Sequence, residues 1–163
     1  MAIENGGVRA DLTWSKTLPV GVSKSEHYDG FVEIVEIAKD LIYRATQKFA
    51  PNYMVVASNV LPVLALCKSF KAAPSGAING PYFAGTLGSL KVFVTPRFTD
   101  GEYIVGCNGG DMMSSAAVYA PYMAVIPTQL LQYADGGESQ GWSTLYALEK
   151  LNPTLVVAGK ITA

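Results

Sequence analysis

The sequence has few charged residues and very little histidine or cysteine. Only 15% of its 163 residues are charged, against an average of about 25% in soluble domains. Half of the residues are hydrophobic, although soluble monomers rarely expose large apolar patches. This balance indicates that part of the apolar surface lies against other subunits, and a tightly packed monomer is the alternative.

Neither sign of charge dominates, and long hydrophobic runs are absent. The net charge is −1, and the twelve basic residues are scattered from Arg9 to Lys160. Nucleic-acid-binding proteins concentrate such residues on one face, so we expect no specific nucleic-acid site. The longest apolar run, residues 116–126, is shorter than the roughly 18 residues of a membrane span. Because a signal-peptide pattern is also lacking, we expect no membrane partner and a cytosolic origin.

Side chains suited to catalysis or metal binding are scarce. The one histidine, His27, lies beside Glu26 and Asp29 with no nucleophile nearby in sequence, which favours a solvated residue at a helix start over a general base. Cys67 and Cys107 lack metal-ligand spacing and are predicted to be buried free thiols. A thiol dyad of Cys67 with His27 is the alternative, but the flanking residues show no activating pattern. We therefore expect no enzyme activity, no metal and no cofactor.

Two further patterns have competing interpretations. Residues 106–115 are rich in glycine but lack the Lys-Ser/Thr ending of a phosphate-binding loop, so a structural turn is favoured. The tyrosines and methionines between residues 112 and 133 suit core or subunit-interface packing. The alternative for them is a ligand pocket near Tyr119 and Tyr122, in a small ligand-binding or enzymatic α+β domain.

Hydrophobic periodicity predicts one long helix and one short helix. Apolar residues recur at helical spacing over residues 31–49, with Asp29 as the expected N-cap. A shorter helix is predicted for residues 59–70, with Pro62 in its first turn. Residues 1–25 show no sustained period and are interpreted as an irregular lead-in.

Short apolar runs between turn residues predict strands. Residues 90–95 and 102–107 flank a turn and are expected to pair with each other, and the last two runs are expected to form a terminal hairpin across Asn152-Pro153. Residues 71–88 are predicted to be a loop. The predicted strands are residues 53–57, 90–95, 102–107, 142–151 and 155–161.

The apolar run at residues 116–126 has to be buried on most sides, either in the core or in an interface. Pro121 excludes a regular interior strand or helix along its whole length. One long helix, one short helix and a mostly antiparallel sheet together predict an α+β fold.

Residues 88–161 resemble a known family. The chain contains GSLKVFVTPRFTDGEYIVG, a glycine-rich turn, AAVYAPYMAVIPTQLL, a second glycine-rich loop and GWSTLYALEKLNP, in that order. This succession resembles the C-terminal portion of the major capsid proteins of contractile-tailed phages, whose subunits have the Hong Kong 97 fold. The chain would be a C-terminal portion of such a protein or a truncated, minimal member.

The resemblance implies a division of the chain. Residues 1–28 would form an N-terminal arm, and residues 29–51 the spine helix of a peripheral domain. Residues 52–140 would form an axial domain with a mixed or antiparallel sheet and short helices. Residues 141–163 would return as a terminal hairpin that packs beside the spine.

The resemblance also implies a function. The chain would be a structural virion protein without catalysis, a major capsid subunit that associates with itself into hexamers and pentamers of an icosahedral shell around phage DNA. Other capsid or scaffolding proteins would be further partners. The protein would reside in the virion capsid after synthesis in the bacterial host cytoplasm. The candidate subunit-contact residues are Tyr119, Tyr122, Met123, Tyr133, Gly136, Gly137 and Trp142.

Overall fold

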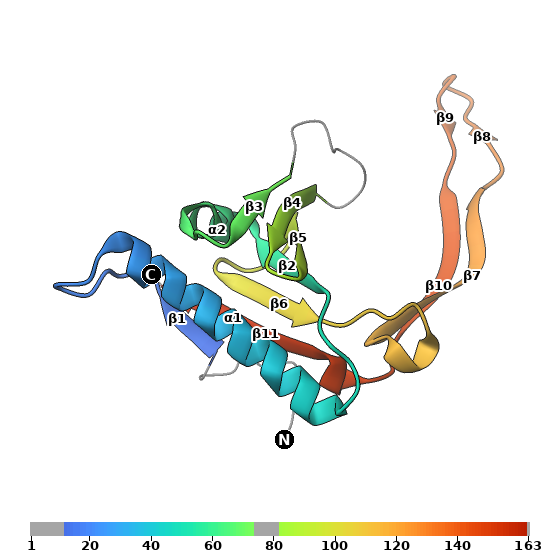
Figure 1. Ribbon diagram of the computed structural model, residues 1–163. Coiled ribbons are helices and arrows are strands. Elements are labelled where there is room, and N and C mark those ends of the chain that lie inside the picture. The colour runs from blue at the N-terminus through green and yellow to red at the C-terminus, as the bar shows by residue number, and fades with distance from the viewer. Residues whose placement is uncertain (1–11, 74–81, 163) are drawn as a thin grey trace.

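The longest element of the computed structural model, which describes residues 12–73 and 82–162, is helix α1, Lys24–Thr46 (Figure 1). Its start is fixed by a capping box. The Ser23 hydroxyl accepts a hydrogen bond from the Glu26 N–H, and the Glu26 carboxylate accepts one from the Ser23 N–H, each at 3.3 Å. Two of the N–H groups that a helix start leaves unpaired are thereby satisfied. The buried face of α1 comprises Phe31, Val35, Ala38 and Ile42.

The predicted helix is confirmed, but its predicted bounds, 31–49, and its predicted cap, Asp29, are wrong. The capping box starts the helix at Lys24, five positions earlier than Asp29. At the other end Gln47 adopts a left-handed conformation, with φ 53°, and its N–H donates to the Tyr43 carbonyl oxygen at 2.7 Å. A left-handed residue of this kind ends a helix, so α1 stops at Thr46, ahead of Pro51.

A seven-stranded mixed sheet makes up the body of the described protein, in the order β1-β11-β6-β2-β5-β4-β3. The pairs β1–β11 and β2–β5 are parallel, and the other pairs are antiparallel. The α+β prediction is therefore confirmed. The strands are Thr13–Ser15 (β1), Tyr53–Ala57 (β2), Phe70–Ala72 (β3), Tyr82–Leu87 (β4), Leu90–Thr95 (β5), Glu102–Gly106 (β6) and Val156–Thr162 (β11).

The predicted pairing of residues 90–95 with residues 102–107 is wrong, although both strands exist. Strand β2 lies between them, so that Val55 pairs with Phe93 on one side and with Ile104 on the other. Central strands of this kind are buried on both faces and favour apolar β-branched residues. The local turn signal therefore located the strands but not their neighbours.

Two predictions for residues 52–88 need correction. The helix predicted for residues 59–70 is divided into a 3-10 turn, η2 (Ser58–Val60), and a six-residue helix, α2 (Leu61–Leu66). Cys67 is extended, and β3 begins at Phe70. The loop predicted for residues 71–88 contains the end of β3 and the whole of β4, while residues 74–81 lie outside the described part.

The two ends of the chain also differ from the predictions. Within the predicted arm, 1–28, residues 1–11 lie outside the described part, β1 belongs to the sheet, and residues 24–28 are helical. The predicted terminal hairpin, 141–163, does not form. Its second strand is β11, which pairs with β6 and β1, and its first strand, Trp142–Lys150 (β10), pairs elsewhere. A 3-10 turn, Pro153–Leu155 (η4), separates them.

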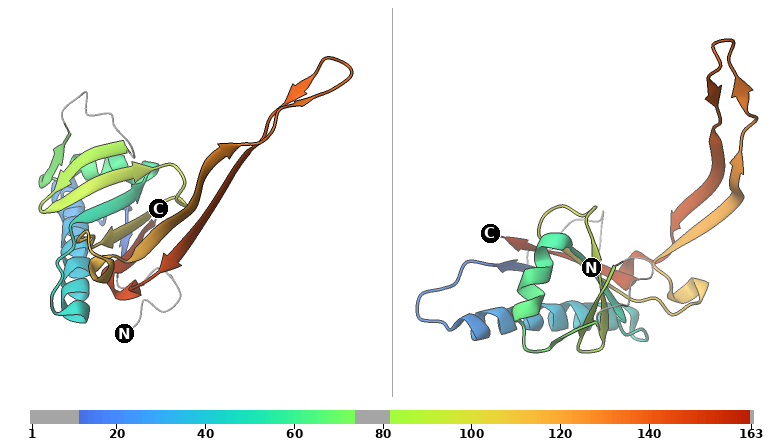
Figure 2. Two further views of the ribbon diagram at one scale, coloured as in Figure 1. Left: turned by 90° about the vertical axis from the view of Figure 1, so that its right-hand side faces the viewer. Right: turned by 90° about the horizontal axis from the view of Figure 1, so that it is seen from above.

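The hydrophobic core lies between α1 and the sheet. Figure 2 shows α1 against one face of the sheet, across β6 and β11. Phe31 from α1 meets Tyr103 from β6 edge to face, with 5.4 Å between ring centroids. Both side chains are fully buried, and the Tyr103 hydroxyl donates to the Leu12 carbonyl oxygen at 2.8 Å. This contact ties the segment before β1 to the centre of the core.

Candidate subunit-contact ribbon

A two-stranded ribbon leaves the body between the neighbouring strands β6 and β11 (Figures 1 and 2). Its stem pairs Ala117–Pro127 (β7) with β10, and its tip pairs Leu131–Gln132 (β8) with Glu138–Ser139 (β9). A 3-10 turn, η3 (Met112–Ser114), precedes it. None of the ribbon residues belongs to the buried core of the described protein.

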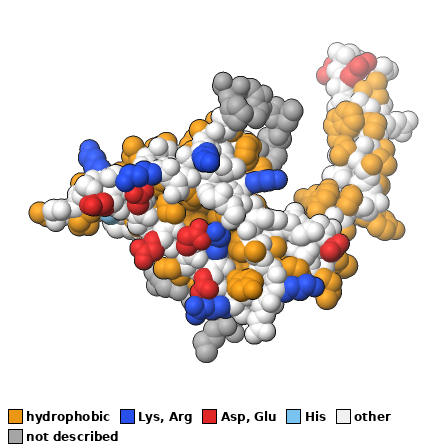
Figure 3. All heavy atoms as spheres, in the orientation of Figure 1, with side chains coloured by type: hydrophobic (Ala, Val, Ile, Leu, Met, Phe, Trp, Pro, Cys, Tyr) orange, Lys and Arg blue, Asp and Glu red, His pale blue; other side chains and the backbone are white. Residues whose placement is uncertain are grey.

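The prediction that residues 116–126 are buried on most sides does not hold for the single chain. Strand β7 is exposed along nearly all of its length, and Tyr122 is 85% exposed. Figure 3 shows hydrophobic side chains along the visible face of the ribbon. Of the two environments predicted, the core is excluded and an interface remains.

The hydrogen bonds at the two ends of the stem fix which backbone groups point outward. Leu151 N–H donates to the Ala116 carbonyl oxygen at 3.0 Å, and Thr128 N–H donates to the Gly141 carbonyl oxygen at 2.7 Å. Bonded and non-bonded pairs alternate along an antiparallel ladder. The pairs Pro121–Tyr146 and Pro127–Trp142 are therefore of the non-bonded kind, and their backbone nitrogens face away from the partner strand.

This alternation of bonded and non-bonded pairs explains how β7 continues through Pro121. A proline lacks an N–H, so it is tolerated where the strand offers no ladder donor. Pro121 and Pro127 both occupy such outward positions. The exclusion of a regular interior strand was sound, because β7 is an edge strand.

The register also places the large side chains. From the pair Ser143–Ile126 to the pair Leu145–Met123, β10 advances by two residues and β7 by three. From there to the pair Tyr146–Pro121, β10 advances by one residue and β7 by two. Each shift is a bulge with one extra residue on β7. Strand β10 thus alternates regularly and β7 does not.

One face of the ribbon collects most of the aromatic side chains. Alternate residues of β10 share a face, and paired residues point the same way. The Tyr119 and Tyr146 rings meet with 5.4 Å between centroids, which agrees with this assignment. We call this set the aromatic face: Trp142, Tyr146, Leu148 and Tyr119.

The opposite face is less aromatic. It carries Leu145 and Met123, together with Ser143, Ala147 and Glu149. Tyr122, which is unpaired at a bulge, is not assigned to either face by the register. A partner that contacts one side of the stem thus meets a different surface from a partner that contacts the other side.

The tip of the ribbon is a tight turn. Tyr133 N–H donates to the Gly137 carbonyl oxygen at 2.8 Å, and Gly136 N–H donates to the Tyr133 carbonyl oxygen at 3.0 Å. Gly136 has a φ of +82°, which a residue with a side chain rarely adopts. The Tyr133 hydroxyl lies 3.1 Å from the Ser139 hydroxyl, so the turn is closed by side chains as well.

The structure brings all seven candidate residues onto this one ribbon. Tyr119, Tyr122, Met123 and Trp142 lie on the stem, and the other three lie at the tip. Sequence reasoning missed Leu145, Tyr146 and Leu148, which are all more than half exposed. The apolar residues of β10 were the available signal, but the expected terminal hairpin assigned them to the body.

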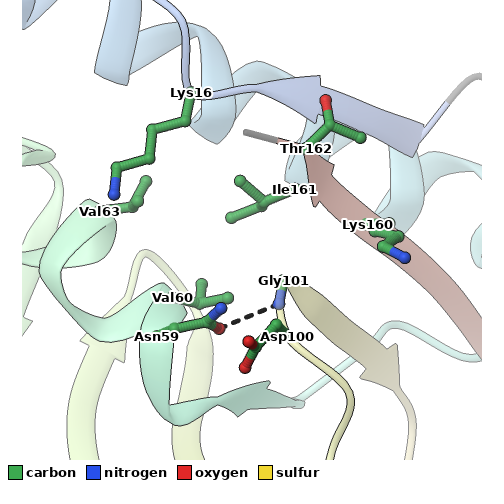
Figure 4. Close-up of a pocket in the computed structure, with 9 residues that line it drawn as sticks. All are labelled: Lys16, Asn59, Val60, Val63, Asp100, Gly101, Lys160, Ile161 and Thr162. Atoms are coloured by element: carbon green, nitrogen blue, oxygen red, sulfur yellow. Dashed lines mark hydrogen bonds between the residues drawn. The ribbon is translucent and has the colours of Figure 1, made fainter.

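Two cavities of the described protein lie away from Tyr119 and Tyr122. One of about 420 Å³ is lined by Lys16, Asn59, Asp100 and Lys160 among others, and Figure 4 shows Asn59 accepting a hydrogen bond from the Gly101 N–H at 3.0 Å. Another, of about 390 Å³, includes Asn52, Tyr53 and Asn108. The alternative of a ligand pocket near the two tyrosines gains no support.

His27 and Cys67, the candidates for a catalytic dyad, make contacts that are typical of structural residues. The His27 ring stacks on Trp14 at 4.7 Å between centroids, and the Cys67 thiol donates to the Tyr28 carbonyl oxygen at 3.3 Å. Burial, assisted by the Asp29 carboxylate, raises the pKa of the Cys67 thiol to about 11. A reactive thiol needs a lowered pKa, so a dyad with His27 is not favoured. Both cysteines are free and buried, as predicted.

Residues 12–73 and 82–162 contain neither a cluster of metal ligands nor a membrane-spanning helix. No group of three or more His, Cys, Asp or Glu side chains is close enough there to hold a metal ion. Within the same residues, no helix has the length and apolar character required to span a membrane.

Solved structures with a similar fold include a bacteriophage capsid and a virus-like particle. A protein of Mycobacterium phage Che8 aligns with a TM-score of 0.57 at 16% identity, over 91% of this chain and 53% of that one. The mature capsid of bacteriophage PhiM1 gives 0.59 at 11% identity, over 92% and 51%. A virus-like particle from Pyrococcus furiosus gives 0.55 at 12% identity, over 91% and 56%. At these identities the likeness shows the fold alone.

The family follows from the sequence itself. Residues 8–162 match the family described as Major capsid protein Gp23, and the chain belongs to that family of tailed-phage major capsid proteins. No curated protein sequence matches it significantly. The chain spans about half the length of the solved capsid structures that it resembles. The predicted resemblance to a phage major capsid protein is thus confirmed.

Proposed function

We propose that this chain is a shell subunit that associates with copies of itself, and that the ribbon is one of its contact surfaces. The observation that carries the proposal is the exposure of the aromatic face: Trp142 is 69% exposed and Leu148 is also 69% exposed, on an element that contributes nothing to the described core. Soluble monomers rarely present such a continuous apolar surface.

The energetics fit a contact that is weak alone and strong in an assembly. Burial of one fully exposed large apolar side chain contributes about 1.5–3 kcal/mol. The four side chains of the aromatic face are between half and three quarters exposed, so their burial gives roughly 4–8 kcal/mol. Association loses about 4–15 kcal/mol of translational and rotational freedom. The ribbon contact therefore falls near balance for two isolated chains, and many such contacts closing a symmetric shell supply collective stability.

The further parts of the proposal concern partners and location. The chain would form hexamers and pentamers, with other capsid or scaffolding proteins as additional partners, and would carry out no catalysis. Its place would be the virion capsid, after synthesis in the bacterial host cytoplasm. The capsid family of the chain supports each of these expectations.

The proposed division of the chain follows the observed topology. Helix α1 and the ribbon would form the peripheral part, with α1 as its spine, and the strands from β2 to β6 would form the axial part. Strand β11 returns to the central sheet next to β6, which supports assigning it to the axial part as well. The contact candidates Tyr133, Gly136 and Gly137 at the ribbon tip would then lie farthest from the axial sheet.

The test compares two tyrosines with nearly equal exposure. Tyr146 on the aromatic face is 56% exposed and Tyr43 on α1 is 55% exposed. We expect the unmodified chain to form oligomers in sedimentation velocity and rings, sheets or shells in negative-stain microscopy. Tyr146→Ser should weaken this association at least tenfold, and Tyr43→Ser should leave it unchanged. A chain that stays monomeric at the highest attainable concentration would disprove the proposal.

A further inference from the structure

The two outer edges of the ribbon differ in their capacity to pair with another strand. Along β7, Pro121 and Pro127 stand at outward positions and present no N–H, and both bulges lie on this strand. Prolines and bulges are the devices that protect an edge strand from pairing. The edge of β7 is therefore blocked.

Strand β10 has none of these protections. The alternation of bonded and non-bonded pairs that places Pro121 and Pro127 outward on β7 also directs the N–H and C=O groups of every second β10 residue outward. The strand contains no proline and alternates regularly, and its only charged residues are Glu149 and Lys150 at one end. A long, regular, apolar edge of this kind is a template for strand pairing. The residues with outward N–H and C=O groups are Trp142, Thr144, Tyr146, Leu148 and Lys150.

We propose that the outer edge of β10 pairs with β10 of a second copy in an antiparallel arrangement, giving a four-stranded sheet; this rests on the proposed self-association. The other free edges of the described sheets belong mainly to β1 and β3, which have three residues each, and to the two-residue strands at the tip. Only β10 offers nine residues. An edge that pairs with its own copy forms a closed two-fold contact.

The aromatic face adds a side-chain contribution to this pairing. Three of its side chains, on Trp142, Tyr146 and Leu148, belong to the residues whose backbone groups point outward. Side chains stand out from the faces of a sheet, whereas the N–H and C=O groups of an edge strand lie in the plane of the sheet. A partner that only covers the aromatic face therefore leaves the β10 edge unpaired. Strand addition pairs these backbone groups and also places side chains of the second strand beside Trp142, Tyr146 and Leu148 on the same face.

A set of three variants separates the backbone contribution from the side-chain contribution. Leu148→Pro removes an outward N–H at a position equivalent to that of Pro121 on β7, so the ribbon itself should tolerate it. Leu148→Ala removes the side chain and keeps the N–H. Ala117→Pro removes an outward N–H on the edge of β7, where no partner is expected. Circular dichroism checks that each variant is folded.

Association is measured by sedimentation velocity on the full chain. We expect Leu148→Pro to weaken self-association about tenfold more than Leu148→Ala, since a hydrogen bond is lost and its acceptor is left unpaired. Ala117→Pro should have no effect. If the unmodified chain associates but Leu148→Pro and Leu148→Ala weaken it equally, strand pairing is wrong while the proposed function stands. If the unmodified chain does not associate, both fail.

Hydrogen exchange and spin labelling identify the partner strand. In the associated state the amides of Thr144, Tyr146 and Leu148 should gain at least tenfold protection, and that of Tyr119 on the β7 edge should not. A spin label at Ala147→Cys, on the face opposite the aromatic face, should lie within about 30 Å of its copy, the length of a nine-residue strand. Protection of the β10 amides with labels farther apart would show that a different strand is bound, and would overturn the proposed β10 pairing.

Discussion

Gly101 provides a sharp test of the packing between the β5–β6 turn and the end of β11. Its φ is +81°, and a Cβ built on it would lie 2.1 Å from the Ile161 carbonyl oxygen. The residue also accepts a hydrogen bond from the Ile161 N–H at 2.8 Å and donates one to the Asn59 side chain at 3.0 Å. We therefore compare Gly101→Ala with Gly110→Ala, because Gly110 has a φ of +83° and nothing within 4 Å of its Cβ position.

The two substitutions share one energetic term and differ in another. A left-handed conformation disfavours alanine by about 1–2 kcal/mol, and the reduced freedom of the unfolded chain returns roughly 0.4–1 kcal/mol. Gly110→Ala should therefore destabilise the protein by only about 1 kcal/mol. At Gly101 the clash displaces a backbone carbonyl group and weakens two hydrogen bonds, which adds roughly 2–4 kcal/mol.

The assay is equilibrium unfolding in urea, followed by circular dichroism at a concentration low enough to exclude association. We expect Gly101→Ala to lower the free energy of unfolding by about 3–5 kcal/mol, with the slope against urea unchanged. A loss at Gly101 equal to that at Gly110 would refute the reasoning, since it would mean that the close approach to Ile161 has no energetic weight.

Three other predictions follow from buried or capping groups. Tyr103→Phe should lower the free energy of unfolding by about 1–3 kcal/mol, because the Leu12 carbonyl oxygen loses its buried donor; a neutral result in urea unfolding would contradict this. The Ser23 hydroxyl and backbone N–H lower the pKa of Glu26 from its ordinary value of 4.5, so its stabilising charge is present above that pH and is lost as the pH falls through the lowered value. Glu26→Gln should therefore destabilise less at low pH than at pH 7, as measured by unfolding across that range. With burial raising the pKa of Cys67 to about 11, thiol reagents should modify it slowly at pH 7 and faster on unfolding; rapid reaction of the native protein at pH 7 would argue against burial.

The sequence was most informative where local signals decide the structure. The apolar spacing of Phe31, Val35, Ala38 and Ile42 identified the face of α1 that is buried. The capping box of Ser23 and Glu26 was present in the sequence as a start signal. The periodic apolar pattern begins later, however, so the predicted start of the helix lay C-terminal to the observed one. The sequence thus predicts which face of a helix is buried better than it predicts where the helix starts and ends.

Strand partners could not be predicted in the same way. The turn between β5 and β6 favours a hairpin, yet Val55 of β2 lies between Phe93 and Ile104. Such pairing joins residues about 40 to 50 positions apart, and nothing in the turn specifies it. Local patterns predicted the α+β class, and the family resemblance supplied the capsid fold within that class.

The candidate site was predicted in composition but not in environment. The run of residues 116–126 was recognised as apolar, and Tyr119 and Tyr122 were identified as contact candidates. A single sequence does not distinguish burial within a subunit from burial between subunits, because both require apolar residues. The outward backbone nitrogens of Pro121 and Pro127 are a more specific sign of an edge strand, and they can be recognised only once the register is known.

The position of the ribbon in the chain has a consequence for how such a protein can change over time. The ribbon leaves and re-enters the body between two adjacent strands, β6 and β11, which remain paired with each other, and the buried core of the described protein contains no residue from it. Under the proposed function, substitutions on the ribbon would alter which neighbours a subunit accepts without lowering the stability of the subunit itself. Selection on lattice geometry and selection on folding act on separate sets of residues, so new contacts can evolve while the fold stays constant.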